Sequence, residues 1–315
     1  MGYRKLIKFG NSSHIVSLPN YWVKKNKLKK GDLIYFEENG NSELVLSSEL
    51  KKVGQESKEI TIDINNKEFD EIKREVHSAY INNFTTINVV GRNINDRELE
   101  VRKIINNLMA AEIVEQSENR ITIRDFLDIN KISIDNLVRK IDILIRSMLI
   151  DYKNNISKEK FESIYRRDHN INKLTFLVYR AVKYSINNPE MAKVYNLDNW
   201  KLMNYWQLVD RLERIGDEVK RIARSLRDIN LGNKEFKKLI EILGKVENFY
   251  VGVMNAYNKQ DISSLHKVLK FKDELLKDCD NYFNDYKRKD LVPNIIEKLK
   301  DMIDHTRTIG RLLYD

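Results

Sequence analysis

The stretch Leu208–Asp228, LVDRLERIGDEVKRIARSLRD, constrains the fold of this chain more than any other. At about 100° per residue, its apolar side chains gather on one side of a helix. These apolar positions are Leu208, Leu212, Ile215, Val219, Ile222, Ala223 and Leu226. Asp210, Glu213 and Asp217 have the i, i+3, i+7 spacing that places them together on the opposite side. The stretch therefore predicts a core-packed helix that also carries a stripe of carboxylates.

The same helical pattern returns later in the chain. A shift of 87 residues without a gap lays 208–228 on 295–315. Six positions are identical, and several others are conservative exchanges. The identical pairs are Leu212 and Leu299, Asp217 and Asp304, Ile222 and Ile309, Arg224 and Arg311, Leu226 and Leu313, and Asp228 and Asp315. Self-similarity of this kind indicates a duplicated structural unit.

The second copy of the acidic pattern is incomplete. A fainter match at a shift of 105 residues places Asp168 on Asp273, so the duplication extends to an earlier helix. Lys300, however, stands where the first copy has Glu213. If the first copy holds a cation, the second copy should hold it more weakly or not at all.

From about residue 132 to the end, the pattern is helical throughout. The loops between helices are short and rich in asparagine, which is typical of helical bundles. With the duplication, this predicts two related three-helix bundles. The expected helices are 133–154, 158–187, 198–230, 234–258, 261–286 and 291–314.

Composition narrows the class of protein. Of the 315 residues, 42% are apolar and 33% are charged, and only three are proline, which favours a helix-rich chain with true cores. No apolar run approaches the roughly 20 residues needed to span a bilayer, and the N-terminus lacks a secretory signal. The single cysteine, Cys279, excludes a disulfide within the chain. We therefore expect a cytoplasmic protein without membrane insertion.

The net charge of +9 is concentrated at the N-terminus. Residues 1–31 contain eight basic residues and no acidic one, whereas the rest has 48 basic and 47 acidic residues. A local basic patch can bind a polyanion electrostatically, and counter-ion release strengthens such binding to nucleic acid. The alternative is a charged face that serves only solubility.

Residues 1–48 predict a small β-rich unit. Short strands are expected at 3–9 and 14–18, a short helix after Pro19, and a hairpin around Asn39-Gly40. So small a unit has little core of its own, and pairing with a second copy would supply the missing burial. A polar linker, 48–58, follows.

Residues 59–130 predict a small α/β region. Strands are expected at 60–64, 87–91, 111–117 and 120–126, and helices at 67–81 and 96–109. The region contains no glycine-rich phosphate loop and no catalytic group of residues. We interpret it as a packing or dimerisation module, and we find no argument for catalysis anywhere in the chain.

The carboxylate stripe allows two interpretations. Oxygen ligands suit hard divalent cations, and Asp168 could join Glu213 and Asp217 from a neighbouring helix. Arg214 and Arg221, however, lie four residues after Asp210 and Asp217, where they can form ion pairs along the helix. The candidate metal ligands are Glu213, Asp217, Asp210 and Asp168, and the metal could be iron, zinc, magnesium or another divalent ion.

The N-terminal sequence RKLIKFGNSSHIVSLPNYWVKKNKLKKGDLIYFEE resembles the AbrB/SpoVT-type DNA-binding domain. That family forms obligate dimers whose chains interleave their hairpins, so the resemblance implies a swapped-hairpin β domain and a homodimer. It also implies which residues face DNA. These are Arg4, Lys5, Lys8, Asn11, Ser12, Ser13 and His14.

The helical half resembles PhoU, a negative regulator of phosphate uptake, through LERIGD at 212–217 followed by Ile222-Ala223. RRDHNINKL, around Asp168, is similar to the other acidic helix of that family, with Asn172 where a second aspartate is usual. Some PhoU-like proteins bind metal clusters through E/D-x-x-x-D pairs, which Glu213 and Asp217 match. Archaeal relatives join an AbrB-type head to such helices through a similar middle region.

These observations predict a multi-domain α+β chain of three parts: a DNA-binding domain at 1–48, an α/β connecting domain at 59–130, and all-α tandem bundles at 131–315. The resemblance implies a non-enzymatic regulator that binds promoter DNA as a dimer. Its bundles would sense phosphate status through a partner, such as a phosphate transporter's ATPase or a sensor protein. The alternative is an adaptor that acts on the transporter and whose N-terminal domain only dimerises.

Overall fold

The computed structural model divides the chain into two compact units, Met1–Gln55 and Glu56–Asp315. The structure describes residues 3–38, 44–48, 58–92, 94–153, 157–188, 192 and 197–314. Most of the expected linker and the expected Asn39-Gly40 turn lie outside the described residues.

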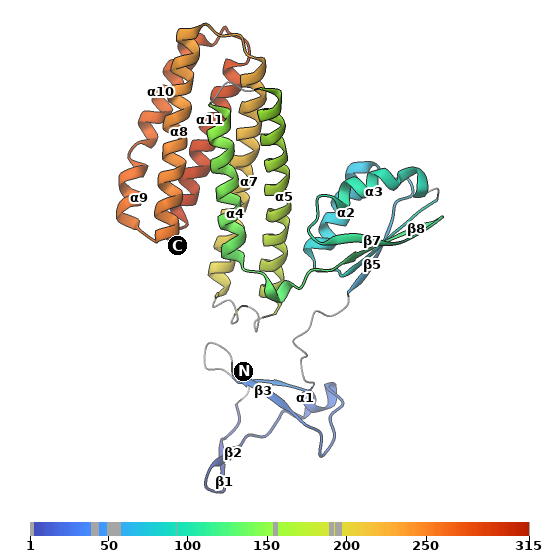
Figure 1. Ribbon diagram of the computed structural model, residues 1–315. Helices are drawn as coiled ribbons and strands as arrows, with labels where there is room; N and C mark the ends of the chain where they lie inside the picture. Colours follow the sequence, from blue (N-terminus) through green and yellow to red (C-terminus); the bar gives the residue numbers. More distant parts are fainter. Residues whose placement is uncertain are drawn as a thin grey trace. The chain divides into compact units, whose positions relative to one another are not determined.

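The N-terminal unit consists of two hairpins and a short helix (Figure 1). Strands β1 (Ile7–Phe9) and β2 (Ser13–Ile15) pair antiparallel, as do β3 (Tyr35–Glu38) and β4 (Leu44–Ser47). Helix α1 (Asn20–Lys25) follows Pro19, as the sequence predicts. Among the described residues of this unit, none is buried. The described part of the unit therefore shows no core within a single chain.

The α/β region is built on one four-stranded sheet of order β5-β6-β8-β7. Strand β5 (Glu59–Asp63), helix α2 (Phe69–Ile81) and strand β6 (Thr86–Val90) form a βαβ unit with parallel strands. The 3-10 turn η1 (Ile94–Arg97) and helix α3 (Glu98–Ile105) lead to the antiparallel strands β7 (Ala111–Ser117) and β8 (Arg120–Asp125).

Helices α2 and α3 lie on the same face of this sheet (Figure 1). Their apolar sides and the inward strand residues form a core of its own, separate from that of the helical bundles. The expected strands and helices of this region are present, and only their ends differ by one to four residues.

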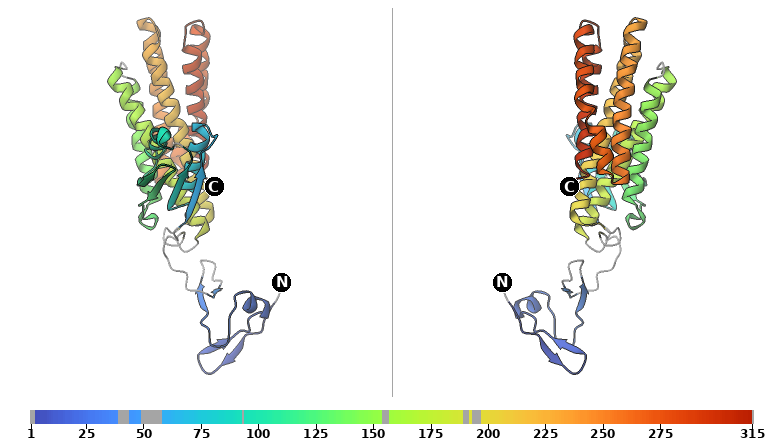
Figure 2. Two further views of the ribbon diagram at one scale, coloured as in Figure 1. Left: turned by 90° about the vertical axis from the view of Figure 1, so that its right-hand side faces the viewer. Right: turned by 90° about the vertical axis from the view of Figure 1, so that its left-hand side faces the viewer.

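The first helical bundle contains α4 (Ile134–Tyr152), α5 (Lys158–Asn187) and α7 (Asn199–Asp228), after the 3-10 turn η2 (Ile129–Lys131). Each helix begins at a side chain that accepts a backbone N–H, and this capping explains where it starts. The capping residues are Ser133, Ser157 and Asp198. The three helices pack against one another and run side by side (Figure 2).

The second bundle contains α8 (Asn233–Lys259), α9 (Ile262–Leu269), α10 (Lys272–Tyr286) and α11 (Val292–Arg311). The prediction of one helix over 261–286 is wrong, because the chain breaks at Lys270-Phe271. Asp273 and Glu274 lie in the first turn of α10, where carboxylates favour a new helix start. Helices α8, α10 and α11 pack together as the second set of three.

Helix α7 joins the two bundles, because it packs on α4 and α5 from one set and on α11 from the other. Its burial therefore extends beyond the single apolar side that periodicity predicts, and it includes Glu218 and Ser225. Gly216, the glycine of LERIGD, lies against α5: a Cβ at this position would be 3.1 Å from Ile171 Cδ1. The glycine thus permits a close approach of α5 and α7.

A buried arginine connects the α/β region to the first bundle. Arg180 of α5 is fully buried and forms a salt bridge with Asp125 at the end of β8. Its Nε donates to Asn83 Oδ1 at 2.9 Å, and its guanidinium lies 4.6 Å from the centre of the Tyr80 ring. Within the described residues, no helix is both long and apolar enough to cross a bilayer.

Candidate functional site

The residues expected to face DNA lie on one hairpin. Arg4 and Lys5 precede β1, Lys8 lies in it, and the register pairs Lys8 with His14 and Phe9 with Ser13. Asn11 and Ser12 form the connecting turn. All seven side chains are exposed. Because residues directly opposite in a ladder point to the same face, Lys8 and His14 share one face of the hairpin.

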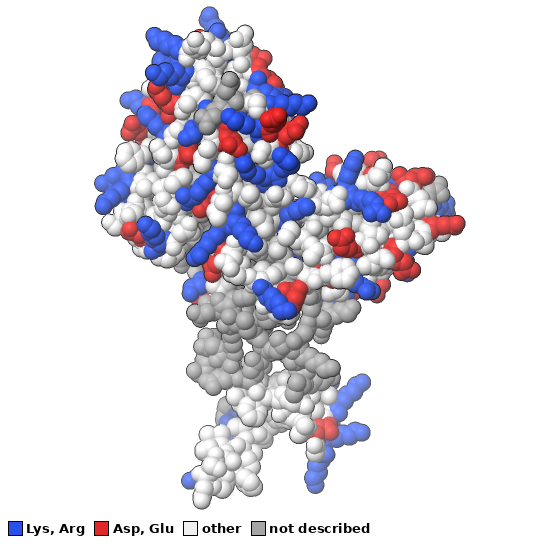
Figure 3. All heavy atoms as spheres, viewed as in Figure 1, with Lys and Arg blue, Asp and Glu red and all other residues white. Residues whose placement is uncertain are grey.

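A second basic group follows helix α1. Lys24 and Lys25 form its last turn, and Lys27, Lys29 and Lys30 lie in the residues after it. The first acid of the chain, Asp32, accepts the backbone N–H of Lys29 at 2.7 Å. This carboxylate therefore closes a turn. On the N-terminal unit, the side chains visible in Figure 3 are mostly basic or uncharged.

The carboxylate stripe of α7 lies along α5. Asp210, Glu213 and Asp217 are each half-buried, so the stripe does not face open solvent as the helical pattern predicted. The expected ion pairs along the helix are present: Arg214 Nε is 3.0 Å from Asp210 Oδ2, and Arg221 Nη2 is 3.2 Å from Asp217 Oδ2. Both ion pairs expected from the i+4 spacing are therefore present.

Asp168 of α5 approaches this stripe, as the sequence suggested. Its side chain is 6% exposed, and the ammonium group of Lys220, a residue of α7, lies between it and Asp217. Lys220 Nζ donates to Asp168 Oδ2 at 2.7 Å and to Asp217 Oδ1 at 2.6 Å. The lysine side chain is itself only 16% exposed. Lys220 was not among the predicted site residues, although it follows Asp217 at the i+3 spacing of a helix ion pair.

Two carboxyl groups of the cluster have raised pKa values. Burial, together with the charges of Asp217 and Asp168, raises the pKa of Glu213 to about 7. Burial also raises the pKa of Asp168, and the ammonium of Lys220 opposes this shift. No salt bridge within the described part of the chain involves Glu213. This carboxyl is therefore the member of the cluster that protonates most readily near neutral pH.

The second copy of the pattern forms no comparable cluster. Asp273, the counterpart of Asp168, is exposed. Lys300, in the position of Glu213, forms an ion pair with Asp280. Asp304 lies 3.5 Å from Arg307, which occupies the position equivalent to Lys220. The unequal duplication inferred from the sequence is thus visible in the contacts.

The arrangement does not suit a metal ion while Lys220 keeps these contacts. Three carboxylates, those of Asp168, Glu213 and Asp217, approach the α5–α7 contact. Asp210 instead pairs with Arg214. The Lys220 ammonium uses one oxygen of Asp168 and one of Asp217. In the part of the chain that the structure describes, no group of three His, Cys, Asp or Glu residues has metal-site geometry.

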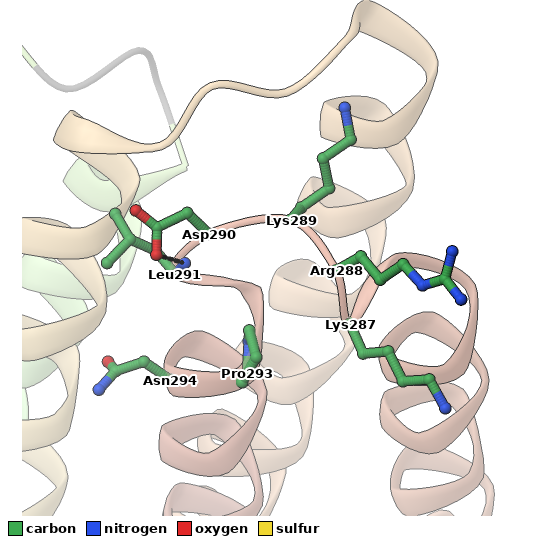
Figure 4. Close-up of a pocket in the computed structure, with 7 residues that line it drawn as sticks. All are labelled: Lys287, Arg288, Lys289, Asp290, Leu291, Pro293 and Asn294. Atoms are coloured by element: carbon green, nitrogen blue, oxygen red, sulfur yellow. Dashed lines mark hydrogen bonds between the residues drawn. The ribbon is translucent and has the colours of Figure 1, made fainter.

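Two hollows on the second unit were not foreseen from the sequence. One lies between α3, β7 and α5, where half-buried His169 and Lys173 line it. The other lies at the turn from α10 to α11 (Figure 4). Its basic side chains, Lys287, Arg288 and Lys289, point in different directions there, so they do not converge on one anion. Elsewhere on the visible face of the bundles, basic and acidic side chains are interspersed (Figure 3).

Comparisons with known proteins find a family similarity in the first bundle. The PhoU domain family matches residues 135–226, which cover α4, α5 and most of α7. The crystal structure of PhoU from Pseudomonas aeruginosa is 18% identical, with a TM-score of 0.48, and covers 57% of this chain and 93% of that one.

A second comparison gives a similarity to a curated protein. Vinckepain-1 from Plasmodium vinckei is 24% identical over 167 residues, which are 47% of this chain and 33% of that protein. The chain thus spans about a third of the length of this curated relative. The range matched by the PhoU domain family, residues 135–226, includes Asp168, Glu213 and Asp217.

Proposed function

We propose that the chain is a non-enzymatic regulator of phosphate uptake or phosphate signalling. In this proposal the N-terminal unit binds promoter DNA as a homodimer, and the PhoU-like helices sense phosphate status through a protein partner. The PhoU domain match at residues 135–226 carries the regulatory part, because PhoU proteins generally regulate phosphate uptake. The partner would be a phosphate transporter's ATPase or a sensor protein.

The absence of burial in the N-terminal unit supports dimerisation. Residues 3–36 and 44–48, whose burial the structure describes, include no buried side chain, yet they carry many large apolar ones that are 44–86% exposed. An unusual number of exposed large apolar side chains in so short a segment favours an interaction site. A second copy is the fitting occupant, because interleaved hairpins would bury these residues in a shared core. The residues are Tyr3, Leu6, Ile7, Phe9, Ile15, Val16, Tyr21, Leu33, Phe36, Leu44 and Val45.

The charge of the hairpin supports DNA as the ligand. Residues 1–31 contain eight basic residues and no acid, and the first acid, Asp32, is bonded to the Lys29 backbone. Exposed basic side chains beside a Gly-Asn-Ser-Ser turn can contact phosphates, and the turn's amides and hydroxyls can donate to phosphates or base edges. In a dimer two such hairpins would act together, which doubles the number of phosphate contacts.

The DNA-binding part is tested by fluorescence anisotropy with duplexes from the promoter of a phosphate transporter operon and with an unrelated duplex. We compare the full chain with the triple variant R4A/K5A/K8A over a series of salt concentrations. If each lost cation removes one phosphate contact, the negative slope of log binding constant against log salt concentration becomes shallower by about 0.9 per contact, or by about 3 per hairpin. The matched control is K234A/K237A/K270A, which removes the same charge from the helical half.

The control should leave DNA affinity and its salt dependence unchanged. If the unaltered chain has no affinity for either duplex at low salt, the DNA-binding part is wrong. If both triple variants weaken binding equally, net charge alone is responsible and the hairpin has no special role.

The second candidate function is an adaptor that acts on a phosphate transporter and uses the N-terminal unit only to dimerise. The same exposed apolar surface favours it, because dimerisation alone would explain that surface. Deletion of residues 1–48 separates the two functions when the molecular mass in solution, which reports the dimer, and the occupancy of the promoter are both measured. Loss of the dimer, with promoter occupancy undetectable even for the full chain, favours the adaptor.

A further inference from the structure

Lys220 has an unusual position for a lysine on a long helix. Its ammonium donates to Asp168 Oδ2 at 2.7 Å and to Asp217 Oδ1 at 2.6 Å, so it bridges α5 and α7. The exposed fractions are 16% for the lysine, 6% for Asp168 and 25% for Asp217. Lysines are rarely buried unless their charge is paired. Here the charge is paired with two carboxylates from two helices.

A divalent cation between α5 and α7 would need the same oxygen atoms. Hard cations are held by carboxylate oxygens, and two of the three carboxylates that approach this contact already accept from the ammonium. The third, Glu213, is half-buried beside them. A lysine ammonium and a metal ion cannot occupy the same position, so the two must compete for Asp168 and Asp217.

The second repeat has a cation in the equivalent place. Arg307 stands 87 residues after Lys220, and its Nη1 is 3.5 Å from Asp304, the counterpart of Asp217. The contact between α7 and α11 has a further ammonium, Lys298, which lies 3.3 Å from Asp301 and 3.9 Å from buried Glu218. Pairing of the acidic positions with cations of the chain itself is therefore a repeated feature of these helices.

We propose that Lys220 is a built-in cation that takes the place of a metal ion between α5 and α7. The native chain therefore needs no divalent metal at this position. Removal of the ammonium exposes Asp168, Glu213 and Asp217 to solvent cations and creates a site for a divalent metal. This inference does not depend on DNA binding or on the identity of a protein partner.

The test uses Mn²⁺ as the probe, because it binds carboxylate oxygens and can be followed by electron paramagnetic resonance. The full-length chain is freed of metal by a chelator and titrated, together with the variants K220M and K220M/D168N. We expect no stoichiometric binding by the unaltered chain. K220M should gain one site per chain with at least ten-fold higher affinity, and D168N in the K220M background should abolish it.

The matched control is K245M. Lys245 also forms a salt bridge with an aspartate, Asp278, at 2.6 Å, but its side chain is 50% exposed. K245M should bind Mn²⁺ no better than the unaltered chain. Thermal unfolding is a second readout: Mn²⁺ should raise the unfolding temperature of K220M and leave that of the unaltered chain unchanged. If K220M does not fold, K220Q replaces it, since glutamine is neutral and polar.

Two results would overturn the proposal. One is an unaltered chain that binds one Mn²⁺ and loses it through D168N, because the metal then coexists with Lys220. The other is a folded Lys220 variant that gains no site.

Discussion

The Arg180 contact between the α/β region and the first bundle gives the sharpest stability prediction. Arg180→Met removes a fully buried guanidinium whose partners belong to α2, β8 and the residues after α2. Methionine fills much of the same volume but leaves Asp125, whose side chain is 4% exposed, without its cation. Asn83 Oδ1 also loses the hydrogen bond that it accepts from Arg180 Nε at 2.9 Å.

The cost follows from the charge that remains buried. Removing one partner of a buried ion pair typically destabilises a protein by about 3–5 kcal/mol, because the other charge stays desolvated and uncompensated. For a unit of this size, 1 kcal/mol corresponds to about 2–4 °C in the unfolding temperature. We therefore expect R180M to lower that temperature by about 6–20 °C.

The assay is thermal unfolding of the full chain followed by circular dichroism, with hydrogen exchange to locate the effect. The matched control is R102M, which makes the same exchange at an exposed pair with Glu98, where the arginine is 51% exposed. Exposed pairs contribute about 0–1 kcal/mol, so R102M should shift the unfolding temperature by only a few degrees at most. In R180M, exchange should accelerate first in α2 and β8.

A double variant isolates the cause. R180M/D125N removes both charges, while asparagine keeps an oxygen for the Leu127 amide, which Asp125 accepts at 3.1 Å. This variant should recover part of the stability lost in R180M. Two results would refute this reasoning. One is an R180M variant whose unfolding temperature falls no further than that of R102M. The other is a double variant that is clearly less stable than R180M, as if the two substitutions acted independently.

Three further predictions concern single titratable groups. Because the pKa of Glu213 is raised to about 7, its ionisation removes stability as the pH rises from about 4.5 to 7, and glutamine cannot ionise. Glu213→Gln should therefore stabilise the chain at pH 8 by about 1–2 kcal/mol, after allowance for solvent screening, and have little effect at pH 4.5. Thermal unfolding across pH measures both values. Burial, and then the charge of Lys73, lower the pKa of His77 to about 4, so protonation of this residue removes stability as the pH falls from 6.5 to 4. His77→Phe should therefore unfold at a lower pH than the unaltered chain, and unfolding of the two proteins at the same pH would contradict this. Cys279 is buried, and burial raises the pKa of its thiol to about 12. It should therefore resist a thiol reagent in the folded chain and react after unfolding in urea, and rapid labelling of the folded chain would contradict this.

The order of helices and the pairs along one helix could be predicted from the sequence. Apolar periodicity located α7, and i+4 spacing identified Arg214 with Asp210 and Arg221 with Asp217. Both signals are local to one helix and need no knowledge of its neighbours. The break before α10 was missed, although Asp273 and Glu274 are the acids expected in a first turn.

The contacts between helices could not be predicted in the same way. Lys220 was overlooked because its second partner, Asp168, is 52 residues earlier in the chain. Glu218 is buried because α11 covers that side of α7, and the periodicity of α7 alone does not indicate this. A glycine at 216 was the available hint of close packing, since no periodic pattern requires one there.

The lysines between helices explain how this bundle keeps carboxylates inside it. A buried carboxylate must be neutralised by protonation, by a cation of the chain or by a metal. Asp168 and Asp217 share Lys220, and Glu218 is near Lys298 and accepts from Arg221 at 2.8 Å. Glu213 lacks such a partner among the described residues, and its pKa is raised to about 7. Burial also raises the pKa of Asp168 and of Glu218, but there the neighbouring cations oppose the shift, as expected if Lys220 and its equivalents supply the positive charge that a metal would otherwise bring.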